Sequence, residues 1–372
     1  MAEISRAVVL DKPNGSFTVH EVQVPDPGQD ELVVQIELCG VCGTDVHLYD
    51  ASLPGVTYPL VLGHEPVGII SKLGKGVTQD YTGRPVKEGD RIYILAGFCG
   101  RCYYCSVADR PNMCENAVCL GAHCWPDREM LLQGGFAQYA HLSDPMVAFL
   151  RMDGVDADTA VSLEPLGTAV QAVERANIRV GSTVVIQGSG AIGLFTLMAA
   201  RELGALKTIM VGAPETRLTL AREFGADVTI NIEEITDPQQ RIDMVKAETT
   251  EGRGADVVFE CSGVPAAVPE GIDMTRIAGT YVIVGQYSDQ GTVPINPYYI
   301  TIRDLTVIGS KSWNVGHNVR ARALMEAKKY PVHKAISHKM PLERLGDVIA
   351  AMQHGYRLDG SQIRKVAIAP GK

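Results

Sequence analysis

Two short stretches of the sequence gather side chains that bind metals and carry protons. Residues 39–47 read CGVCGTDVH, and residues 63–65 read GHE. Zn²⁺ is bound by thiolate sulfur, imidazole nitrogen and carboxylate oxygen, and a catalytic zinc has three protein ligands with a fourth position open. A single cysteine or histidine is usually structural, but the two stretches together make Cys42 and His64 candidate zinc ligands.

Four later cysteines have the spacing of a closed metal site. They are Cys99, Cys102, Cys105 and Cys114, and the successive gaps between them contain two, two and eight residues. Four thiolates on one short segment hold a tetrahedral zinc with no open position, so this second zinc is expected to be structural. A disulfide-bonded lobe and an iron–sulfur cluster are the alternatives. Cys39 and Cys42 also form a CxxC pair, for which a redox role is the alternative to metal binding.

A glycine-rich loop in the second half of the chain predicts a dinucleotide site. Residues 183–187 (TVVIQ) predict a strand, residues 188–193 (GSGAIG) match GxGxxG, and residues 194–203 predict a helix. Glycines at these positions permit a tight turn, the approach of backbone N–H groups to a pyrophosphate, and close packing of the helix on the strand. The expected coenzyme-binding residues of this loop are Gly188, Gly190, Ala191, Ile192 and Gly193.

The end of the second nucleotide-binding strand bears on the choice of coenzyme. An acidic residue there normally binds the adenosine ribose, but this chain has Gly212. Loss of the carboxylate removes its repulsion of a 2′-phosphate, and Arg217 is close enough in sequence to pair with one. Alternatively, Glu215 serves the ribose, or Arg217 is a solvated helix residue. NAD and NADP both stay open, and the pattern favours NADP.

The pattern of elements divides the 372 residues into two regions. Residues 1–38 alternate apolar and polar side chains between Pro/Gly turns, and further strands are expected at 67–73 and 91–95, as in a β-rich domain. From residue 182 onward, six strands alternate with helices, which predicts a doubly wound parallel sheet. A chain of this length with 46% hydrophobic residues can form two cores, and its fold class is α/β.

Composition and charge exclude several classes of protein. The net charge is −9 and no run of Lys or Arg offsets it, so a nucleic-acid partner is not expected. The longest apolar stretch, residues 191–200, is about half of the roughly 20 residues that a membrane-spanning helix needs, and the N-terminus lacks an apolar signal core. We therefore expect a soluble, cytoplasmic protein without a membrane partner. The nine cysteines are clustered, as metal ligands are in a reducing compartment.

Taken in order, these motifs resemble the zinc-dependent medium-chain alcohol dehydrogenase family across essentially the whole chain. In its polyol and threonine dehydrogenase branches the third zinc ligand is a carboxylate, and residues 163–167 (LEPLG) resemble theirs, which implies Glu164 as a ligand. From the residues alone, stabilisation of a helix N-terminus explains Glu164 equally well. The resemblance also implies that Glu65 is a carboxylate able to move onto the metal and that Asp45 orients His64.

The resemblance further implies an architecture. A GroES-like β-rich catalytic domain would span residues 1–164 and be rejoined by 312–372, and a Rossmann coenzyme domain would span 165–311, with the active site between them. A homodimer or homotetramer is implied as well, and residues 298–302 (YYITI) are expected to be an exposed β edge at the subunit contact. Two features depart from the family pattern. Eight residues separate Cys105 from Cys114, where seven are commoner, and Gly212 stands in place of the acidic residue at the end of the second nucleotide-binding strand.

The expected reaction is hydride transfer between an alcohol, more specifically a secondary alcohol, and NAD(P)⁺, with two zinc ions per subunit. Thr44 and His47 are expected to carry the proton away from the alcohol; a turn hydroxyl and a surface histidine are the alternatives. A zinc-independent enone reductase is a rival on the same fold, but such enzymes lack the ligands Cys42, His64 and Glu164. A catalytically silent binding or structural protein is the rival from another class.

The substrate itself is left open by the sequence. The candidate pocket residues mix aromatic, aliphatic and amide side chains, namely Tyr49, Tyr58, Leu95, Trp125, Gln286 and Trp313. This mixture suits a cyclic or medium-sized secondary alcohol as well as a polyol. Residues 123–125 (HCW) are given no chemical role.

Overall fold

The computed structural model describes residues 3–53, 56–122, 132–285, 287 and 291–371. The chain folds into two compact units. One contains Met1–Glu164, Asn314–Lys328 and Val332–Lys372, and the other contains Pro165–Trp313 and Lys329–Pro331. Below, these are the first and the second unit.

A seven-stranded sheet forms the centre of the first unit, with the order β14-β17-β3-β4-β5-β7 and with β6 also paired to β3. Its strands are β3 Leu32–Val41, β4 Glu65–Leu73, β5 Arg91–Leu95, β6 Tyr139–Leu142, β7 Ala148–Arg151, β14 Ile336–Met340 and β17 Lys365–Ile368. All the pairs are antiparallel except β14 with β17. The strands expected at 67–73 and 91–95 are therefore present, and β3 lies between β4 and β17.

Smaller elements complete this unit. Two hairpins are formed by β1 Ile4–Leu10 with β2 Phe17–Gln23 and by β15 Arg357–Leu358 with β16 Ser361–Gln362. The helices are α1 Gly43–Tyr49, α2 Tyr103–Ser106, α3 Ala157–Ala160, α10 Val315–Glu326 and α11 Leu345–Gln353, with short 3-10 turns at Pro111–Met113, Val332–Ala335 and Leu342–Arg344. The core packs apolar side chains of β3, β4 and β5 against α11 and β17, because strands buried on one face alternate apolar and polar residues.

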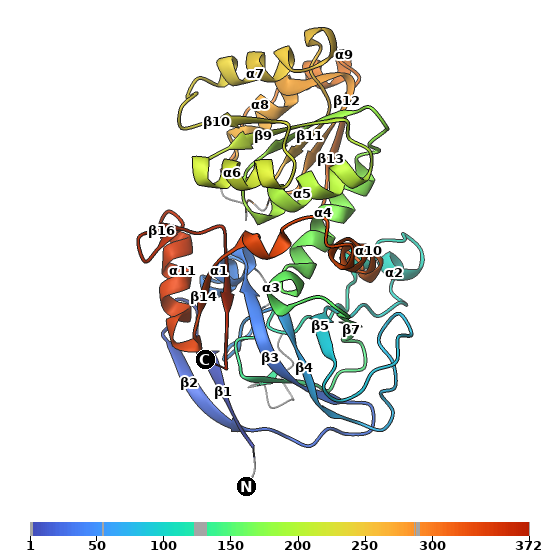
Figure 1. Ribbon diagram of the computed structural model, residues 1–372, viewed down its shortest axis with the longest axis vertical. Helices are drawn as coiled ribbons and strands as arrows, with labels where there is room; N and C mark the ends of the chain where they lie inside the picture. The colour runs from blue at the N-terminus through green and yellow to red at the C-terminus, as the bar shows by residue number, and fades with distance from the viewer. Residues whose placement is uncertain (1–2, 54–55, 123–131, 286, 288–290, 372) are drawn as a thin grey trace. The chain divides into compact units, whose positions relative to one another are not determined.

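The second unit is a six-stranded parallel sheet in the order β10-β9-β8-β11-β12-β13. Its strands are β8 Thr183–Gln187, β9 Lys207–Gly212, β10 Val228–Asn231, β11 Ala255–Glu260, β12 Thr275–Ile283 and β13 Thr306–Gly309. Its helices are α5 Ala191–Glu202, α6 Glu215–Glu223, α7 Pro238–Ala247, α8 Ala267–Met274 and α9 Pro297–Ile302, with a 3-10 turn at Thr250–Gly252. In Figure 1, α5 and α6 lie along one side of the sheet and α7 and α8 along the other. The predicted doubly wound α/β sheet is confirmed.

One predicted element is wrong. Residues 298–302 were expected to form a strand edge, but they lie in helix α9. Asn296 caps this helix by accepting a hydrogen bond from the backbone N–H of Tyr298, and Pro297 occupies the first helical position, where a proline is well tolerated. These local start signals outweigh the β propensity of the aromatic and β-branched residues that follow. The edge strands of the sheet are β10 and β13.

Helix α4, Leu163–Arg175, begins at the last residues of the first unit and continues into the second. Glu164 lies in its first turn. Within the described ranges, no helix is both long enough and apolar enough to cross a membrane.

Candidate active site

The first candidate zinc site is built at the ends of two neighbouring antiparallel strands. Strand β3 ends at Val41, and Cys42 follows as the N-cap of α1. His64 directly precedes β4, and Glu65 is its first residue, paired with Gly40 of β3. Because antiparallel neighbours bring the end of one strand beside the start of the other, Cys42, His64 and Glu65 meet in space.

The three side chains form a group that fits a zinc ion. One ligand atom from each of Cys42, His64 and Glu65 lies within 4.8 Å of the others. Glu65 is fully buried, and within the described part of the chain its Oε1 finds no hydrogen-bond partner. Buried polar atoms are rarely left in this state, and each normally has a protein, water or ion partner. A thiolate, an imidazole and a carboxylate are also the donor set that zinc accepts.

Asp45 holds two of these ligands in place. Its Oδ1 lies 3.5 Å from Nδ1 of His64, and its Oδ2 accepts a hydrogen bond of 2.8 Å from the backbone N–H of Cys42. Burial is the largest single influence and lowers the pKa of His64, but the charge and hydrogen bond of Asp45 together with the contact of Cys42 outweigh it and raise that pKa well above the usual value. With Nδ1 facing Asp45, Nε2 is the nitrogen left for a metal, as the expected orienting role of Asp45 requires.

Glu164 lies near this group but outside its closest set. Its carboxylate is not among the ligand atoms within 4.8 Å of one another. Its charge nevertheless acts on Glu65, whose pKa is raised first by burial and then by Glu164, against the opposing effect of Lys365. Glu65 is therefore the carboxylate closest to Cys42 and His64, and Glu164 is a second carboxylate whose charge acts on Glu65.

Lys365 is the site residue that the sequence analysis missed. Its Nζ lies 2.5 Å from Glu65 Oε2, and the lysine is 5% exposed. It is the first residue of β17, which pairs with β3 although more than 300 positions separate them in the chain. The only sign of a buried lysine in the sequence was its place directly before the apolar run VAIA at 366–369. Lysines are rarely buried unless they are paired, so this sign alone did not identify Lys365.

Thr44 and His47 lie on one face of α1, since they are three residues apart on a helix. Thr44 Oγ1 accepts a hydrogen bond from Cys42 Sγ over 3.7 Å. His47 Nδ1 lies 3.2 Å from the hydroxyl of Ser52, which is exposed. Cys42 thus contacts Thr44, and His47 contacts the exposed Ser52, which the sequence analysis did not single out.

The four lobe cysteines come together as their spacing predicts. One sulfur atom from each of Cys99, Cys102, Cys105 and Cys114 lies within 4.8 Å of the others. The backbone N–H of Arg101 is the main cause that lowers the pKa of Cys99 to about 6, and the backbone N–H groups of Cys99 and Asn116 both donate to Cys114 Sγ at 3.4 Å. N–H donors aimed at sulfur stabilise thiolates, so this lobe suits a structural zinc.

Two further cysteines near the first site are protonated thiols. Cys39 is completely buried, and burial, followed by the charge of Asp45, raises its pKa well above the usual value. Burial likewise raises the pKa of Cys119 to about 11. Redox-active cysteines need a lowered pKa and access to solvent, so the geometry favours metal binding by Cys42 over a Cys39–Cys42 redox pair.

The glycine-rich loop of the second unit has the geometry that its motif requires. Gly188 directly follows β8 and has φ = +105°, and a Cβ there would lie 2.8 Å from the backbone nitrogen of Ser262. Gly190 is the N-cap of α5, and Ala191, Ile192 and Gly193 form its first turn. A Cβ on Gly193 would lie 1.8 Å from the carbonyl oxygen of Gly188, so only glycine permits this close packing.

Gly212 ends β9 beside this loop, and its surroundings explain the missing acidic residue. A Cβ at Gly212 would lie 2.7 Å from Ser189 Oγ, which donates a hydrogen bond of 2.9 Å to the carbonyl of Ala213. Glu215 is paired with Arg222, with Oε1 2.6 Å from Nη1. Arg217 lies in the first turn of α6. The carboxylate nearest in sequence to Gly212 is therefore already bound to an arginine.

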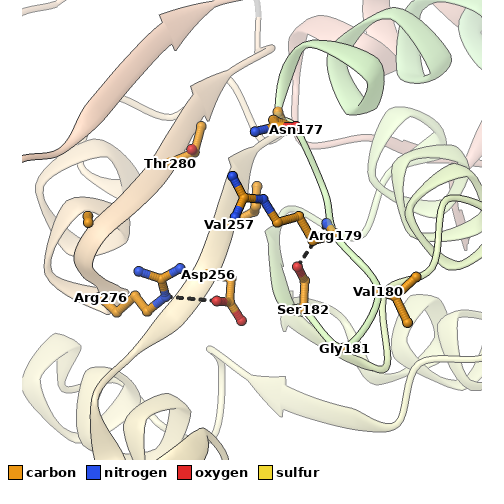
Figure 2. Close-up of a pocket in the computed structure, with 11 residues that line it drawn as sticks. Asn177, Arg179, Val180, Gly181, Ser182, Asp256, Val257, Arg276 and Thr280 are labelled. Atoms are coloured by element: carbon orange, nitrogen blue, oxygen red, sulfur yellow. Dashed lines mark hydrogen bonds and ion pairs between the residues drawn. The ribbon is translucent and has the colours of Figure 1, made fainter.

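A cavity of about 510 Å³ lies elsewhere in the second unit, and Figure 2 shows its lining. Ser182, just before β8, and Asp256, near the start of β11, line it. Arg276 Nε donates a hydrogen bond of 2.7 Å to Asp256 Oδ1 in this cavity. It thus lies at the edge of the sheet where the parallel strands begin, whereas the glycine-rich loop lies at the edge where they end.

The candidate pocket residues are distributed over both units. In the first unit, Leu95 is 2% exposed, and the hydroxyl of Tyr58 donates a hydrogen bond of 2.5 Å to the carbonyl of Leu48. Tyr49 stacks on Phe17, with ring centroids 5.5 Å apart. In the second unit, Trp313 is buried. Residues 123–125, which include Trp125, and residue Gln286 lie outside the described residues.

Comparison with known proteins identifies the family. Residues 28–152 match the alcohol dehydrogenase GroES-like domain, and residues 191–329 match the zinc-binding dehydrogenase family. The chain is 34% identical over 361 residues to 5-exo-hydroxycamphor dehydrogenase of Pseudomonas putida, which covers 95% of this chain and 97% of that protein. It is 32% identical over 344 residues to a sorbitol dehydrogenase of Halalkalibacterium halodurans. That match covers 92% of this chain and 94% of the sorbitol dehydrogenase.

A solved structure agrees with these matches. The zinc-binding dehydrogenase of Sinorhizobium meliloti, bound to NADP, superimposes with a TM-score of 0.83 at 32% identity and covers 99% of this chain and 100% of its own. Fold, motif order and sequence identity extend over nearly the full length. The chain therefore belongs to the zinc-dependent medium-chain alcohol dehydrogenase family, whose members transfer a hydride between an alcohol and NAD(P)⁺, and it is an oxidoreductase of that kind.

Proposed function

We propose that this dehydrogenase oxidises a secondary alcohol with NADP⁺ at a zinc held by Cys42, His64 and Glu65, with Glu164 as a further carboxylate ligand. The observation that carries the proposal is the buried cluster itself. Three ligand atoms of suitable chemistry lie within 4.8 Å of one another, and Glu65 Oε1 finds no hydrogen-bond partner in the described part of the chain. The first unit would be the catalytic domain and the second the coenzyme domain.

The chain's own residues supply the route for the proton. A bound zinc would act as a Lewis acid on the alcohol oxygen and lower its pKa, and the coenzyme would supply the hydride acceptor. The hydroxyl of Thr44 can accept a proton and donate its own, and His47 lies on the same face of α1 to receive it. From His47 the hydroxyl of Ser52, 3.2 Å from Nδ1, leads to solvent.

Support for NADP comes from three observations in and around α6. Gly212 replaces the carboxylate that would repel a 2′-phosphate, and Ser189 leaves no room for a side chain there. Glu215 forms an ion pair with Arg222, which competes with the ribose hydroxyl for that carboxylate. Arg217 is the cation that we place against the 2′-phosphate. The Sinorhizobium meliloti structure that the chain resembles is bound to NADP.

Support for a secondary alcohol comes from the relatives. 5-exo-Hydroxycamphor is a cyclic secondary alcohol and sorbitol is a polyol with secondary hydroxyls, and the chain resembles dehydrogenases named for each. The described pocket candidates Tyr49, Tyr58 and Leu95 are aromatic or aliphatic, which suits a substrate with a sizeable apolar surface.

A panel of cyclic, linear and polyhydroxylated alcohols, offered with NAD⁺ and NADP⁺ in parallel, tests the proposal when combined with metal analysis. We expect two zinc ions per chain, faster reduction of NADP⁺, and the highest kcat/KM with secondary alcohols. One zinc per chain, held by the cysteine lobe, and no alcohol-dependent turnover would contradict the catalytic site. A replacement of Cys42 by Ser should remove one zinc and the activity together.

We further propose a homodimer or homotetramer in the cytoplasm, acting on a small molecule and not on nucleic acid or membranes. Support for the oligomer comes from apolar side chains exposed beside the β13 edge, where Tyr298 and Ile302 of α9 are each 61% exposed and Ile277 is 68% exposed. None of the eight described cysteines is in a disulfide, which suits a reducing compartment. Sedimentation equilibrium would test the oligomeric state, and a monomer would contradict it.

A further inference from the structure

Glu260 is a completely buried carboxylate at the end of β11, in the middle of the parallel sheet. The order of this sheet reverses between β8 and β11, because β9 and β10 follow β8 on one side while β12 and β13 follow β11 on the other. Ligands of such sheets bind in the crevice beyond the carboxyl ends of the strands at this reversal. Glu260 therefore lies at the base of the crevice in which we expect the coenzyme.

The side chain of Glu260 connects the two loops that follow β11 and β12. Its Oε1 accepts hydrogen bonds from the backbone N–H groups of Ser262 (2.6 Å) and Gly263 (3.0 Å) and from the hydroxyl of Ser262. Its Oε2 accepts a hydrogen bond from the hydroxyl of Tyr287. A Cβ at Gly285 would overlap that Oε2, so a larger residue there would displace the carboxylate. One side chain thus determines the positions of both loops.

The first of these loops contacts the glycine-rich loop. The backbone N–H of Cys261 donates a hydrogen bond of 2.8 Å to the carbonyl of Gln187, and a Cβ at Gly188 would lie 2.8 Å from the backbone nitrogen of Ser262. The half of the sheet formed by β8, β9 and β10 receives the adenosine, because the ribose-binding position ends its second strand. The half that contains Glu260 therefore receives the nicotinamide nucleotide.

In the described part of the chain, no cation is paired with Glu260. Its four hydrogen-bond donors are backbone N–H groups and hydroxyls. Burial, followed by the charge of Glu260, raises the pKa of Cys261 and of Tyr281, so this negative charge acts on its surroundings. Salt screens a buried charge only weakly. The nicotinamide ring is positively charged in NAD(P)⁺ and uncharged in NAD(P)H, so the same carboxylate acts differently on the two forms.

We propose that Glu260 determines specificity for the redox state of the coenzyme and shifts binding toward the oxidised form. Its hydrogen bonds position the two loops for both forms, and its charge attracts the pyridinium ring of NAD(P)⁺ alone. The reduced coenzyme is then released more readily after it has received the hydride. The inference rests on the family's use of NAD(P)⁺ and not on the choice between NAD⁺ and NADP⁺ proposed above.

The test compares Glu260→Gln with the native full-length protein at equal zinc content. Glutamine keeps the shape of the side chain and an oxygen for the N–H groups of Ser262 and Gly263, but it removes the charge. Isothermal titration calorimetry measures the Kd of NADP⁺ and NADPH, and of NAD⁺ and NADH. We expect the ratio of the oxidised to the reduced Kd to rise by about tenfold for both pairs, well below the limit for two unit charges in contact.

Two further variants separate charge from loop position. Tyr287→Phe removes the hydrogen bond to Oε2 and keeps the carboxylate, so it should weaken both forms of the coenzyme equally and leave the ratio unchanged. Tyr287→Lys places an ammonium group beside the carboxylate and should raise the ratio, which tests the charge even if Glu260→Gln does not fold. Glu251→Gln is the control, because Glu251 is 66% exposed and lies in the turn before β11; all four Kd values should stay at the native values.

Other outcomes would overturn the inference. Equal losses of affinity for the oxidised and reduced forms in Glu260→Gln, or in Tyr287→Lys where Glu260→Gln does not fold, would show that Glu260 positions the loops without discriminating between redox states. A ratio that falls would mean that its charge favours the reduced form. If instead the native protein binds neither coenzyme, the assignment of the coenzyme domain fails and not merely the role of Glu260.

Discussion

Asp45 lies against His64 in a completely buried position, with Oδ1 3.5 Å from Nδ1 of the imidazole. The other oxygen of the same carboxylate accepts a hydrogen bond from the backbone N–H of Cys42. One side chain thus orients two candidate ligands, one just after β3 and the other just before β4. A metal ligand that is held in this way loses less conformational entropy on binding, and its basicity is raised by the carboxylate.

Replacement of Asp45 by Asn should therefore weaken zinc binding at this site. The substitution keeps the shape but removes the charge that faces His64, and outer partners of this kind are worth about 10- to 100-fold in metal affinity. Competition with a chromophoric chelator measures the effect. Asp11→Asn, at an exposed position, is the control. Equal affinity in the Asp45 variant and the native protein would show that Asp45 has no orienting role.

Thr44→Val tests the proton route. The substitution keeps the branched shape and removes the hydroxyl, so kcat should fall by about 10²- to 10⁴-fold, the usual contribution of a positioned proton-transfer group. Thr44→Ser should retain most of the activity. Zinc content should stay at the native value in both, as metal analysis would show. Thr57→Val, in an exposed loop, is the matched control, and a Thr44→Val enzyme with native kcat would exclude Thr44 from the route.

The sequence predicted those features that are encoded locally. The lobe cysteines lie within 16 positions of one another, and the glycine-rich loop joins a strand directly to a helix, so spacing alone determines their geometry. The parallel sheet followed from the alternation of strands and helices, because parallel neighbours need a crossover helix. In each case, residues that act together are close in the chain.

The features that the sequence did not predict depend on distant contacts or on one competing local signal. Lys365 reaches Glu65 only because β17 pairs with β3, and no periodicity in either segment specifies that pairing. The strand expected at 298–302 is helix α9, because a capping Asn296 and Pro297 outweigh β propensity. The steric effect of Ser189 on Gly212 likewise requires two strands to be placed side by side.

Arg217→Ala should weaken the binding of NADP⁺ and leave that of NAD⁺ nearly unchanged. If Arg217 pairs with the 2′-phosphate, its loss removes a charge-assisted interaction worth about 1.5–3 kcal/mol, so KM for NADP⁺ should rise by about tenfold or more. KM for NAD⁺ should stay within about twofold, since NAD⁺ has no such phosphate. Arg253→Ala is the control, because Arg253 is exposed and paired with Glu251. Equal changes for both coenzymes would remove Arg217 from the phosphate site.

Cys114→Ser should remove the structural zinc and leave the catalytic one. Cys114 Sγ lies 3.5 Å from Cys99 Sγ and 3.9 Å from Cys102 Sγ, and three thiolates bind zinc much less tightly than four. Zinc content should fall from two ions to one per chain, and the lobe should become sensitive to proteolysis because metal binding and folding are coupled there. Two zinc ions per chain in this variant would contradict a Cys₄ site.

Asp80 should make the first unit sensitive to acid. This buried carboxylate pairs with Arg322 of α10, with Oδ2 3.0 Å from Nη1, and both side chains are at most 3% exposed. Burial would raise the pKa of Asp80, but hydrogen bonds from Arg151, Thr82 and Arg84 outweigh it and lower the pKa below the usual value. Asp80→Asn removes the nearest negative charge from buried Arg322 and leaves Glu326, 4.0 Å away, as its other carboxylate, which should cost about 3 kcal/mol at pH 7, the lower end of the range for breaking a buried ion pair.

The dependence of this cost on pH has a definite sign. A carboxyl group whose pKa is lowered by folding contributes stability above its unfolded pKa of about 3.9, and the contribution is lost as the pH falls through the folded value. The difference in unfolding free energy between native protein and Asp80→Asn should thus stay constant from pH 7 to about 5 and shrink below about 4. Urea unfolding at each pH measures it, with Asp26→Asn, whose side chain is 94% exposed, as the control. A difference that grows on acidification would mean that Asp80 is protonated in the folded protein and that its contact with Arg322 is not an ion pair.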